Sequence, residues 1–209
     1  MSVESDLTDY YDREAAAGVR FSMGSRGRRD DLRAAFIELL VAEGRSAIVE
    51  VGSGPGTDAS AFTDAGLDYA GFDLAIGNSR VAHTLALRIV PASLFAPPYR
   101  PGCFDAGWTM STLLHVPDNR FEAAMHATVS MLKPGAPLAI GLWGGTDREF
   151  TNDTDHFDPP RFFSLRADDR IQTMMSNTVS SSRSSHGRMI AATGATSSSS
   201  CGCDRPSLE

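Results

Sequence analysis

Residues 48–57 have the sequence IVEVGSGPGT, in which an apolar run leads directly into three glycines at alternate positions. Except for Glu50, the run has the continuous apolar character of a strand that is buried on both faces. Glycines let the backbone turn tightly and come close to a ligand, and the N–H groups that begin a following helix can face a polar or anionic group. The segment therefore predicts a strand, a ligand-binding turn and a helix, in that order.

Four more short apolar runs follow the first, and segments of helical periodicity separate them. The five runs lie at residues 47–51, 69–72, 89–92, 104–108 and 138–142, and the expected helices at 57–65, 78–86 and 118–132. Strands that alternate with helices favour a parallel sheet of the α/β class, doubly wound and covered by helices on both faces.

The second run ends at Gly71-Phe72-Asp73, seventeen residues after Gly56. A carboxylate at the end of a strand suits two vicinal ribose hydroxyls, because it can accept a hydrogen bond from each. The glycine spacing is G-x-G-x-G, whereas dinucleotide-binding proteins have G-x-G-x-x-G. Two alternatives stay open for the turn, which are the binding of a nicotinamide or flavin cofactor and a purely structural function.

The segment resembles motif I of class I S-adenosylmethionine-dependent methyltransferases, an acidic residue followed by G-x-G-x-G. Later segments also resemble this family: Phe104-Asp105 in the fourth strand, residues 113–116 after it, and 131–135 (MLKPG) before the fifth strand. The landmarks cover residues 46–145, about half of the chain. The resemblance implies a Rossmann-like, mainly parallel sheet, S-adenosylmethionine as the cofactor, and methyl transfer as the activity.

Position by position, the resemblance also implies roles for single residues. The glycines, Thr109 and Met110 would border the methionine part of the cofactor, and Glu50 would anchor the turn near the cofactor amino group. Ser93 departs from the family, which often has an acidic residue there in contact with adenine, so a charge-assisted hydrogen bond is lost. The predicted cofactor-binding residues are Glu50, Gly52, Ser53, Gly54, Gly56, Asp73, Leu74, Ser93, Leu94, Thr109, Met110 and Tyr11.

Two further side chains are candidates for the reaction itself. His115 follows the fourth strand and would lie near the crevice at the carboxyl ends of the strands, so it is the candidate general base. Its alternative role is that of a capping or packing histidine. An N-terminal aromatic residue covers the cofactor in related small-molecule enzymes, so Tyr10 or Tyr11 is a candidate lid, with ordinary helix packing as the alternative.

The acidic loop at 146–160 holds oxygen and imidazole ligands, but their spacing is not diagnostic of a metal site. These residues are Asp153, Asp155, His156 and Asp158. We interpret the segment as a solvated loop or a substrate lid and expect no metal.

Composition restricts the partners of the chain. A formal charge of −7 over 209 residues disfavours nucleic acid, and no N-P-P-Y sequence follows the fourth strand, as it does in base-amino nucleic-acid methyltransferases. No run of 18 apolar residues exists, and the first twelve residues are polar and acidic, so neither a membrane span nor secretion is expected. Three scattered cysteines favour reduced thiols. We therefore expect a cytoplasmic enzyme with a small-molecule acceptor, and the oligomeric state stays undefined.

Two other classes of function remain open at this point. One is a nicotinamide-dependent oxidoreductase, against which the glycine spacing argues. The other is a non-catalytic, cofactor-binding or regulatory protein.

Composition and the pattern of apolar residues divide the chain into four regions. They are a helical N-terminal cap at 1–45, the cofactor-binding core at 46–145, a loop and short helix at 146–175 that is a candidate substrate lid, and a Ser-rich, low-complexity tail at 176–209. The tail holds 11 serines in 34 residues and is not expected to form a core element, so the C-terminal strands should be missing or altered.

Two explanations of the tail stay open. It is either a native disordered segment or the out-of-frame translation of a gene whose true product ends in strands. If its serines use TCN codons, a shifted frame would turn each Ser-Ser step into an apolar residue. An out-of-frame tail would leave the fifth strand as an exposed edge.

Overall fold

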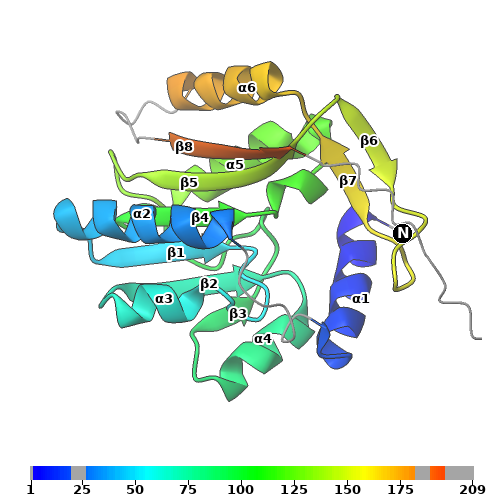
Figure 1. The fold of residues 1–209 in the computed structure, drawn as a ribbon, viewed down its shortest axis with the longest axis horizontal. Helices are drawn as coiled ribbons and strands as arrows, with labels where there is room; N and C mark the ends of the chain where they lie inside the picture. Colours follow the sequence, from blue (N-terminus) through cyan, green and yellow to red (C-terminus); the bar gives the residue numbers. More distant parts are fainter. Residues whose placement is uncertain (1, 20–26, 182–188, 196–209) are drawn as a thin grey trace, which may run out of the picture.

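The structure, a computed structural model, describes residues 2–19, 27–181 and 189–195. At its centre is a six-stranded sheet in which every pair of neighbouring strands is parallel (Figure 1). In sheet order, the strands are β3 (Ile89–Pro91), β2 (Asp68–Asp73), β1 (Ala47–Val51), β4 (Ala106–Met110), β5 (Leu138–Gly144) and β8 (Met189–Ala195). The five predicted apolar runs all contribute to this sheet, which confirms the predicted α/β class and the doubly wound arrangement.

The position of β1 creates the place where a ligand can enter. From β1 the chain moves outward to β2 and β3, then returns to the other side of β1 to form β4 and β5. The loops after β1 and β4 therefore diverge, and a crevice opens between them at the carboxyl ends of the strands. Four of the five residues of β1 and all five of β4 are buried, as predicted for strands covered on both faces.

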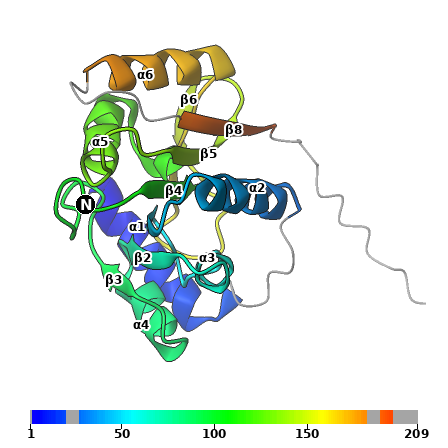
Figure 2. The ribbon, with the colours of Figure 1, turned by 90° about the vertical axis from the view of Figure 1, so that its left-hand side faces the viewer.

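Helices cover both faces of the sheet, so the core has two halves (Figure 2). On one face Phe36, Phe62 and Ala82 pack against the strands from α2, α3 and α4. On the other face Phe121 and Ile171 do so from α5 and α6. These helices are α2 (Arg28–Ala42), α3 (Ala59–Asp64), α4 (Ile76–Thr84), α5 (Asp118–Ser130) and α6 (Asp168–Ser181).

The N-terminal helix α1 (Val3–Ala16) stands at the end of the sheet, apart from α2 (Figure 1). Ser2 caps it by accepting a hydrogen bond from the N–H of Ser5 at 3.2 Å. The carboxylate of Asp12 accepts a hydrogen bond of 2.6 Å from the N–H of Gly77, in the first turn of α4, and this bond joins the two helices. The predicted helical cap at 1–45 thus consists of two helices with different neighbours, since α1 packs against α4 whereas α2 packs on one face of the sheet.

A short hairpin occupies the first part of the segment 146–175, where a loop was expected, and the short helix expected after it corresponds to the beginning of α6. β6 (Arg148–Thr151) pairs antiparallel with β7 (Phe162–Leu165), and the Phe150 and Phe163 rings stack with their centroids 5.5 Å apart. Each strand has four residues and polar neighbours, so neither shows a continuous apolar run. The hairpin brings residues 161–163 to the end of the sheet next to α1 (Figure 1).

The C-terminal region corrects the expectation for the tail. Helix α6 continues to Ser181, and β8 pairs with β5 over seven residues, from Leu138 opposite Met189 to Gly144 opposite Ala195. The edge of β5 is therefore covered, although the strand that covers it is parallel. The Ser-rich run at 197–200 and the segment 182–188, on which the out-of-frame hypothesis rests, lie outside the described residues.

Candidate active site

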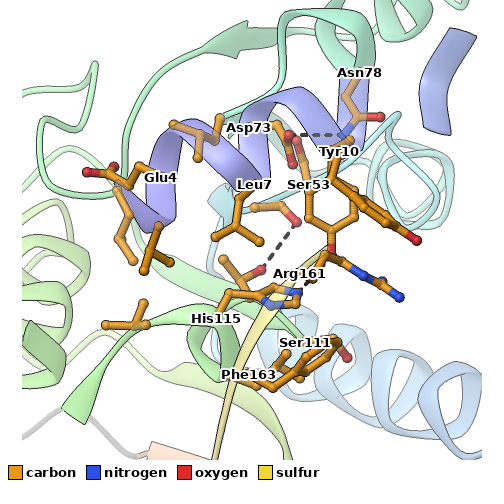
Figure 3. A pocket seen from close by; sticks show the side chains of 18 of the residues that line it. Glu4, Leu7, Tyr10, Ser53, Asp73, Asn78, Ser111, His115, Arg161 and Phe163 are labelled. Atoms are coloured by element: carbon orange, nitrogen blue, oxygen red, sulfur yellow. Dashed lines mark hydrogen bonds between the residues drawn. The ribbon is translucent and has the colours of Figure 1, made fainter. Parts of the chain in front are cut away.

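A cavity of about 740 Å³ lies at the carboxyl ends of four strands, in the predicted crevice (Figure 3). Residues just after these strands line it: Gly52 and Ser53 after β1, Asp73 and Leu74 at the end of β2, Ala92 and Leu94 after β3, Met110 and Thr112 after β4. Helix α1 closes the opposite side with Leu7, Tyr10 and Tyr11. The cavity is thus enclosed between the ends of the strands and the N-terminal helix.

The glycine turn after β1 is shaped by the backbone rather than by side chains. Gly52, Gly54 and Gly56 have φ values of +68°, +56° and +92°, which L side chains rarely adopt. The N–H groups of Gly52 and Ser53 both donate to the carbonyl of Phe72, at 2.9 and 3.1 Å. This pairing fixes the turn against the end of β2, so the two strand ends that carry the predicted cofactor contacts move as one unit.

Asp73 is held in one orientation by three donors. Its Oδ2 accepts from the N–H of Gly54 at 2.7 Å, and its Oδ1 accepts from the N–H of Ala75 and from Nδ2 of Asn78, both at 3.0 Å. A carboxylate has about four acceptor sites, so roughly one remains, on the Oδ2 that also holds the glycine turn. Asp73 can accept one ligand hydroxyl as it stands, and the neighbouring Asn78 amide is a second polar contact at the same wall.

His115 and Tyr11 meet in the cavity although 104 residues separate them. His115 ends a 3₁₀ turn, η2 (Leu113–His115), and its Nδ1 lies 2.7 Å from the carbonyl oxygen of Phe162. A carbonyl only accepts, so Nδ1 carries the proton and Nε2 of the neutral ring is an acceptor. The Tyr11 hydroxyl, 2.7 Å from Nε2, therefore donates to it. The two residues form a hydrogen-bonded pair in which Nε2 of His115 is the basic atom and Tyr11 is the donor.

Arg161 adds a positive charge beside this pair. Its guanidinium lies over the Tyr10 ring, 4.4 Å from the ring centroid, and donates to the carboxylate of Asp155 through Nε and Nη2, at 2.9 and 2.6 Å. Burial raises the pKa of Asp155, but the hydrogen bonds and charge of Arg161 outweigh that effect and lower it. The acidic loop thus holds Arg161 in place. Within the described residues, no group of three or more His, Cys, Asp or Glu side chains could hold a metal ion.

Glu50 faces away from the cavity, into the layer between the sheet and α2. Its carboxyl group is fully buried and accepts a hydrogen bond from the Tyr69 hydroxyl at 2.6 Å. Burial raises the pKa of Glu50 well above its usual range, and the nearby Asp58 carboxylate raises it further, against the opposing charge of Arg29. In the same cluster Asp58 forms ion pairs with Arg29 and Arg33.

The structure brings most of the predicted site residues to the cavity wall. Those that line it are Tyr11, Gly52, Ser53, Asp73, Leu74, Leu94, Met110 and His115. Gly54 and Gly56 form the turn behind the wall, Thr109 is buried within β4, and Ser93 contacts α1 instead. Their predicted contacts with a cofactor remain predictions.

Other residues that line the cavity had no signal in the sequence. Glu4, Arg29, Asn78 and Thr112 are among them. Glu4 and Arg29 come from helices that only the tertiary fold brings to the crevice. Asn78 lies on α4 and Thr112 beyond the end of β4, and neither belongs to a motif with a defined spacing.

The parallel sheet, the glycine turn and Asp73 at the switch in strand order are features of class I S-adenosylmethionine-dependent methyltransferase domains. Residues 48–135 of the chain match the family described as "Methyltransferase domain". An "Uncharacterized methyltransferase" from Mycolicibacterium gilvum (strain PYR-GCK) is 40% identical over 106 residues, which are 47% of this chain. The chain spans about 40% of the length of that relative.

Solved structures share the fold at low sequence identity. The 1,6-didemethyltoxoflavin-N1-methyltransferase of Burkholderia thailandensis, solved with S-adenosylhomocysteine, has a TM-score of 0.56 at 14% identity over 75% of this chain and 80% of its own. The sugar N-methyltransferase KedS8 from Streptoalloteichus sp ATCC 53650 has a TM-score of 0.56 at 16% identity, over 70% of this chain and 78% of its own. The [4+2]-cyclase SpnF has a TM-score of 0.56 at 19% identity, over 72% of this chain and 56% of its own. At these identities the likeness shows the fold alone.

Proposed function

We propose that the chain binds S-adenosylmethionine in this cavity and transfers its methyl group to a small-molecule acceptor. One observation carries the proposal: the glycine turn is bonded to Asp73 through the N–H of Gly54, at the wall of a cavity that also holds the Tyr11–His115 pair. The turn exposes backbone, Asp73 offers an acceptor for a ribose hydroxyl, and Leu74, Leu94 and Phe95 supply apolar walls for a base.

The chain's own residues would orient the acceptor and take its proton. S-adenosylmethionine, when bound, supplies a methyl group that is activated by its sulfonium. An acceptor hydroxyl or ammonium that donates to the Tyr11 oxygen passes its proton there, while Tyr11 passes its own proton to Nε2 of His115. The Phe162 carbonyl, bonded to Nδ1–H, stabilises the imidazolium that results.

Several features support a small molecule as the acceptor. Cavities of roughly 300–1,000 Å³ are typical of small-molecule sites, and this one must hold the cofactor as well. The formal charge of −7 disfavours a phosphate backbone as partner. Two of the proteins with a similar fold are a 1,6-didemethyltoxoflavin-N1-methyltransferase and a sugar N-methyltransferase. A cytoplasmic location belongs to the same proposal, and in the described ranges no helix is long and apolar enough to cross a membrane.

The experiment is a calorimetric titration of the chain with S-adenosylmethionine, S-adenosylhomocysteine and NADH. We expect the two sulfur ligands to bind, NADH not to bind, and Asp73→Ala to weaken binding by about tenfold or more, since a charged hydrogen-bond partner is lost. Asp153→Ala, in the exposed loop, is the matched control and should bind normally. A folded chain that binds NADH, or none of the three ligands, would refute the cofactor assignment.

Turnover tests the proton relay separately. His115→Asn keeps a donor for the Phe162 carbonyl but removes Nε2, so S-adenosylhomocysteine should still bind. Release of S-adenosylhomocysteine across a panel of hydroxyl and amine acceptors should slow by about 10²–10⁴-fold, the usual contribution of a general base. Equal rates in both proteins would show that His115 has only a packing function.

A further inference from the structure

Glu4, in the first turn of α1, lines the cavity next to the end of β3. The Ser93 hydroxyl donates its only proton to Oε1 of Glu4, and the same oxygen of Ser93 accepts from the N–H of Phe95 at 3.1 Å. Ser93 is therefore saturated as a donor, and it serves to hold the carboxylate of Glu4. The negative charge at this strand end comes from a helix 89 residues away in the chain.

A second contact fixes the other oxygen of Glu4. Nη1 of Arg120, on α5, lies 3.4 Å from Oε2, and the same guanidinium lies over the Phe95 ring, 3.5 Å from its centroid. Two donors reach a carboxylate that has about four acceptor sites, so about two sites remain. The Glu4 side chain is one-third exposed. It thus presents an oriented acceptor in a cavity that Leu94 and Phe95 also line.

Such a site suits a flat heterocycle with an N–H donor on its edge. The ring would lie against the apolar side chains, and the carboxylate would accept a charge-assisted hydrogen bond from the exocyclic amino group. In the view of Figure 3, Glu4 lies at one side of the cavity, Tyr10 and Arg161 at the other, and Asp73 between them. A nucleoside that contacts Asp73 with its ribose can therefore direct its base toward Glu4 and its 5′ substituent toward the Tyr11–His115 pair.

We infer that Glu4 binds the 6-amino group of the cofactor adenine and so makes the site selective for adenosine over its 6-oxo counterpart. The inference rests on the proposed function and adds a specificity-determining residue to it. Because α1 carries Glu4, adenine also links α1 to the ends of the strands when the cofactor binds.

The test compares S-adenosylhomocysteine with S-inosylhomocysteine, which carries a 6-oxo group in place of the 6-amino group. In the unaltered chain we expect S-adenosylhomocysteine to bind at least about tenfold more tightly, because an oxygen would face the carboxylate. Glu4→Ala should lose about tenfold in affinity for S-adenosylhomocysteine and bind the two ligands about equally. Glu4→Gln keeps an acceptor without the charge and should fall between these two proteins.

Asp9→Ala is the matched control, because Asp9 is an exposed carboxylate on the same helix and does not line the cavity. It should keep the preference for S-adenosylhomocysteine. The inference is wrong if Glu4→Ala keeps the preference of the unaltered chain, or if it weakens both ligands equally with its thermal unfolding unchanged. If the unaltered chain binds neither ligand, the proposed function fails first. Binding of S-adenosylhomocysteine with unchanged selectivity in Glu4→Ala rejects only the role of Glu4.

Discussion

Gly52 occupies the point where β1 ends and the loop after β4 passes closest to it. A Cβ atom added at this position would lie 2.8 Å from Cβ of Thr112 and closer still to the other atoms of that side chain. Thr112 cannot easily move away, because its hydroxyl donates to the carbonyl of Val51 at 3.1 Å. The residue must therefore be glycine for two reasons, its positive φ and its lack of a side chain.

Gly52→Ala should destabilise the chain more than Gly66→Ala. Both positions have positive φ, +68° and +81°, so an alanine costs about 1–2 kcal/mol in backbone strain at either one. Only Gly52 adds a steric overlap, of about 1–3 kcal/mol, since a Cβ at Gly66 meets no atom within 4 Å. Urea unfolding at constant pH measures both losses. Equal losses in the free energy of unfolding would mean that the loop after β4 moves away from the added methyl group without destabilising the chain.

Residues of the site that depend on local sequence were predictable, and those that depend on tertiary contacts were not. Gly52 and Asp73 follow from the order strand, glycine turn, helix and acidic strand end, and His115 from its place after the fourth strand. Glu4 and Asn78 lie on helices whose sequences carry no sign of a ligand. They reach the cavity wall only because the fold packs α1 against α4 at the ends of the strands.

Asp105 connects two of the sequence landmarks of the family at the level of secondary-structure elements. Its Oδ2 accepts from the N–H of Ala47 at the start of β1, at 3.1 Å, and its Oδ1 from Nζ of Lys133 at 2.7 Å. Burial raises the pKa of Asp105, but the hydrogen bonds from Lys133, Ala47 and Ser46 outweigh it and lower the pKa to about 2. The F-D and L-K-P-G landmarks thus join β1, β4 and the turn before β5.

Asp105→Asn should cost about 1 kcal/mol at pH 7, because the ion pair with Lys133 is half-exposed and screened. A carboxyl group whose pKa is lower in the folded than in the unfolded chain, where it is about 3.9, stabilises the fold above that value. This stabilisation is lost as the pH falls through about 2. The difference in the free energy of unfolding between the two proteins, measured in urea, should stay constant from pH 7 to pH 5 and become smaller below pH 4.

Asp153→Asn, at an exposed loop position, is the control for that series and should match the unaltered chain throughout. If the difference for Asp105→Asn stays the same at pH 3, neutral hydrogen bonds rather than the charge of Asp105 hold the elements together.

Elements with a strong periodic signal were also the predictable ones. Most residues of β1, β2, β4 and β5 are buried, so these strands are largely apolar and stand out from their neighbours. In contrast, β6 and β7 have four residues each and gain their stability from pairing with each other. Helix α2 begins at Arg28, and Asp30 and Asp31 lie in its first turn, where they complement the helix dipole.

At the scale of the whole molecule, both ends of the chain complete what the central domain begins. The segment 48–135 provides the strand ends and the glycine turn, but α1 from the N-terminal side and Arg161 from the hairpin close the cavity. β8 covers the edge of β5 at the far side of the sheet. The segment that matches the family model therefore supplies the strand ends at the base of the cavity, whereas the residues that close it come from outside that segment.

The role of β8 can be measured by shortening the chain. Ending it at residue 181 removes β8 and exposes seven residues of the apolar strand β5 as an unpaired edge, which other copies of the chain can pair with. We expect self-association that increases with concentration, seen by size-exclusion chromatography with light scattering. The melting temperature should fall by about 2–4 °C for each kcal/mol lost. A chain ended at residue 195 keeps β8 and is the control. If both shortened chains behave like the full chain, pairing with β8 contributes nothing to stability, and β5 tolerates being an edge.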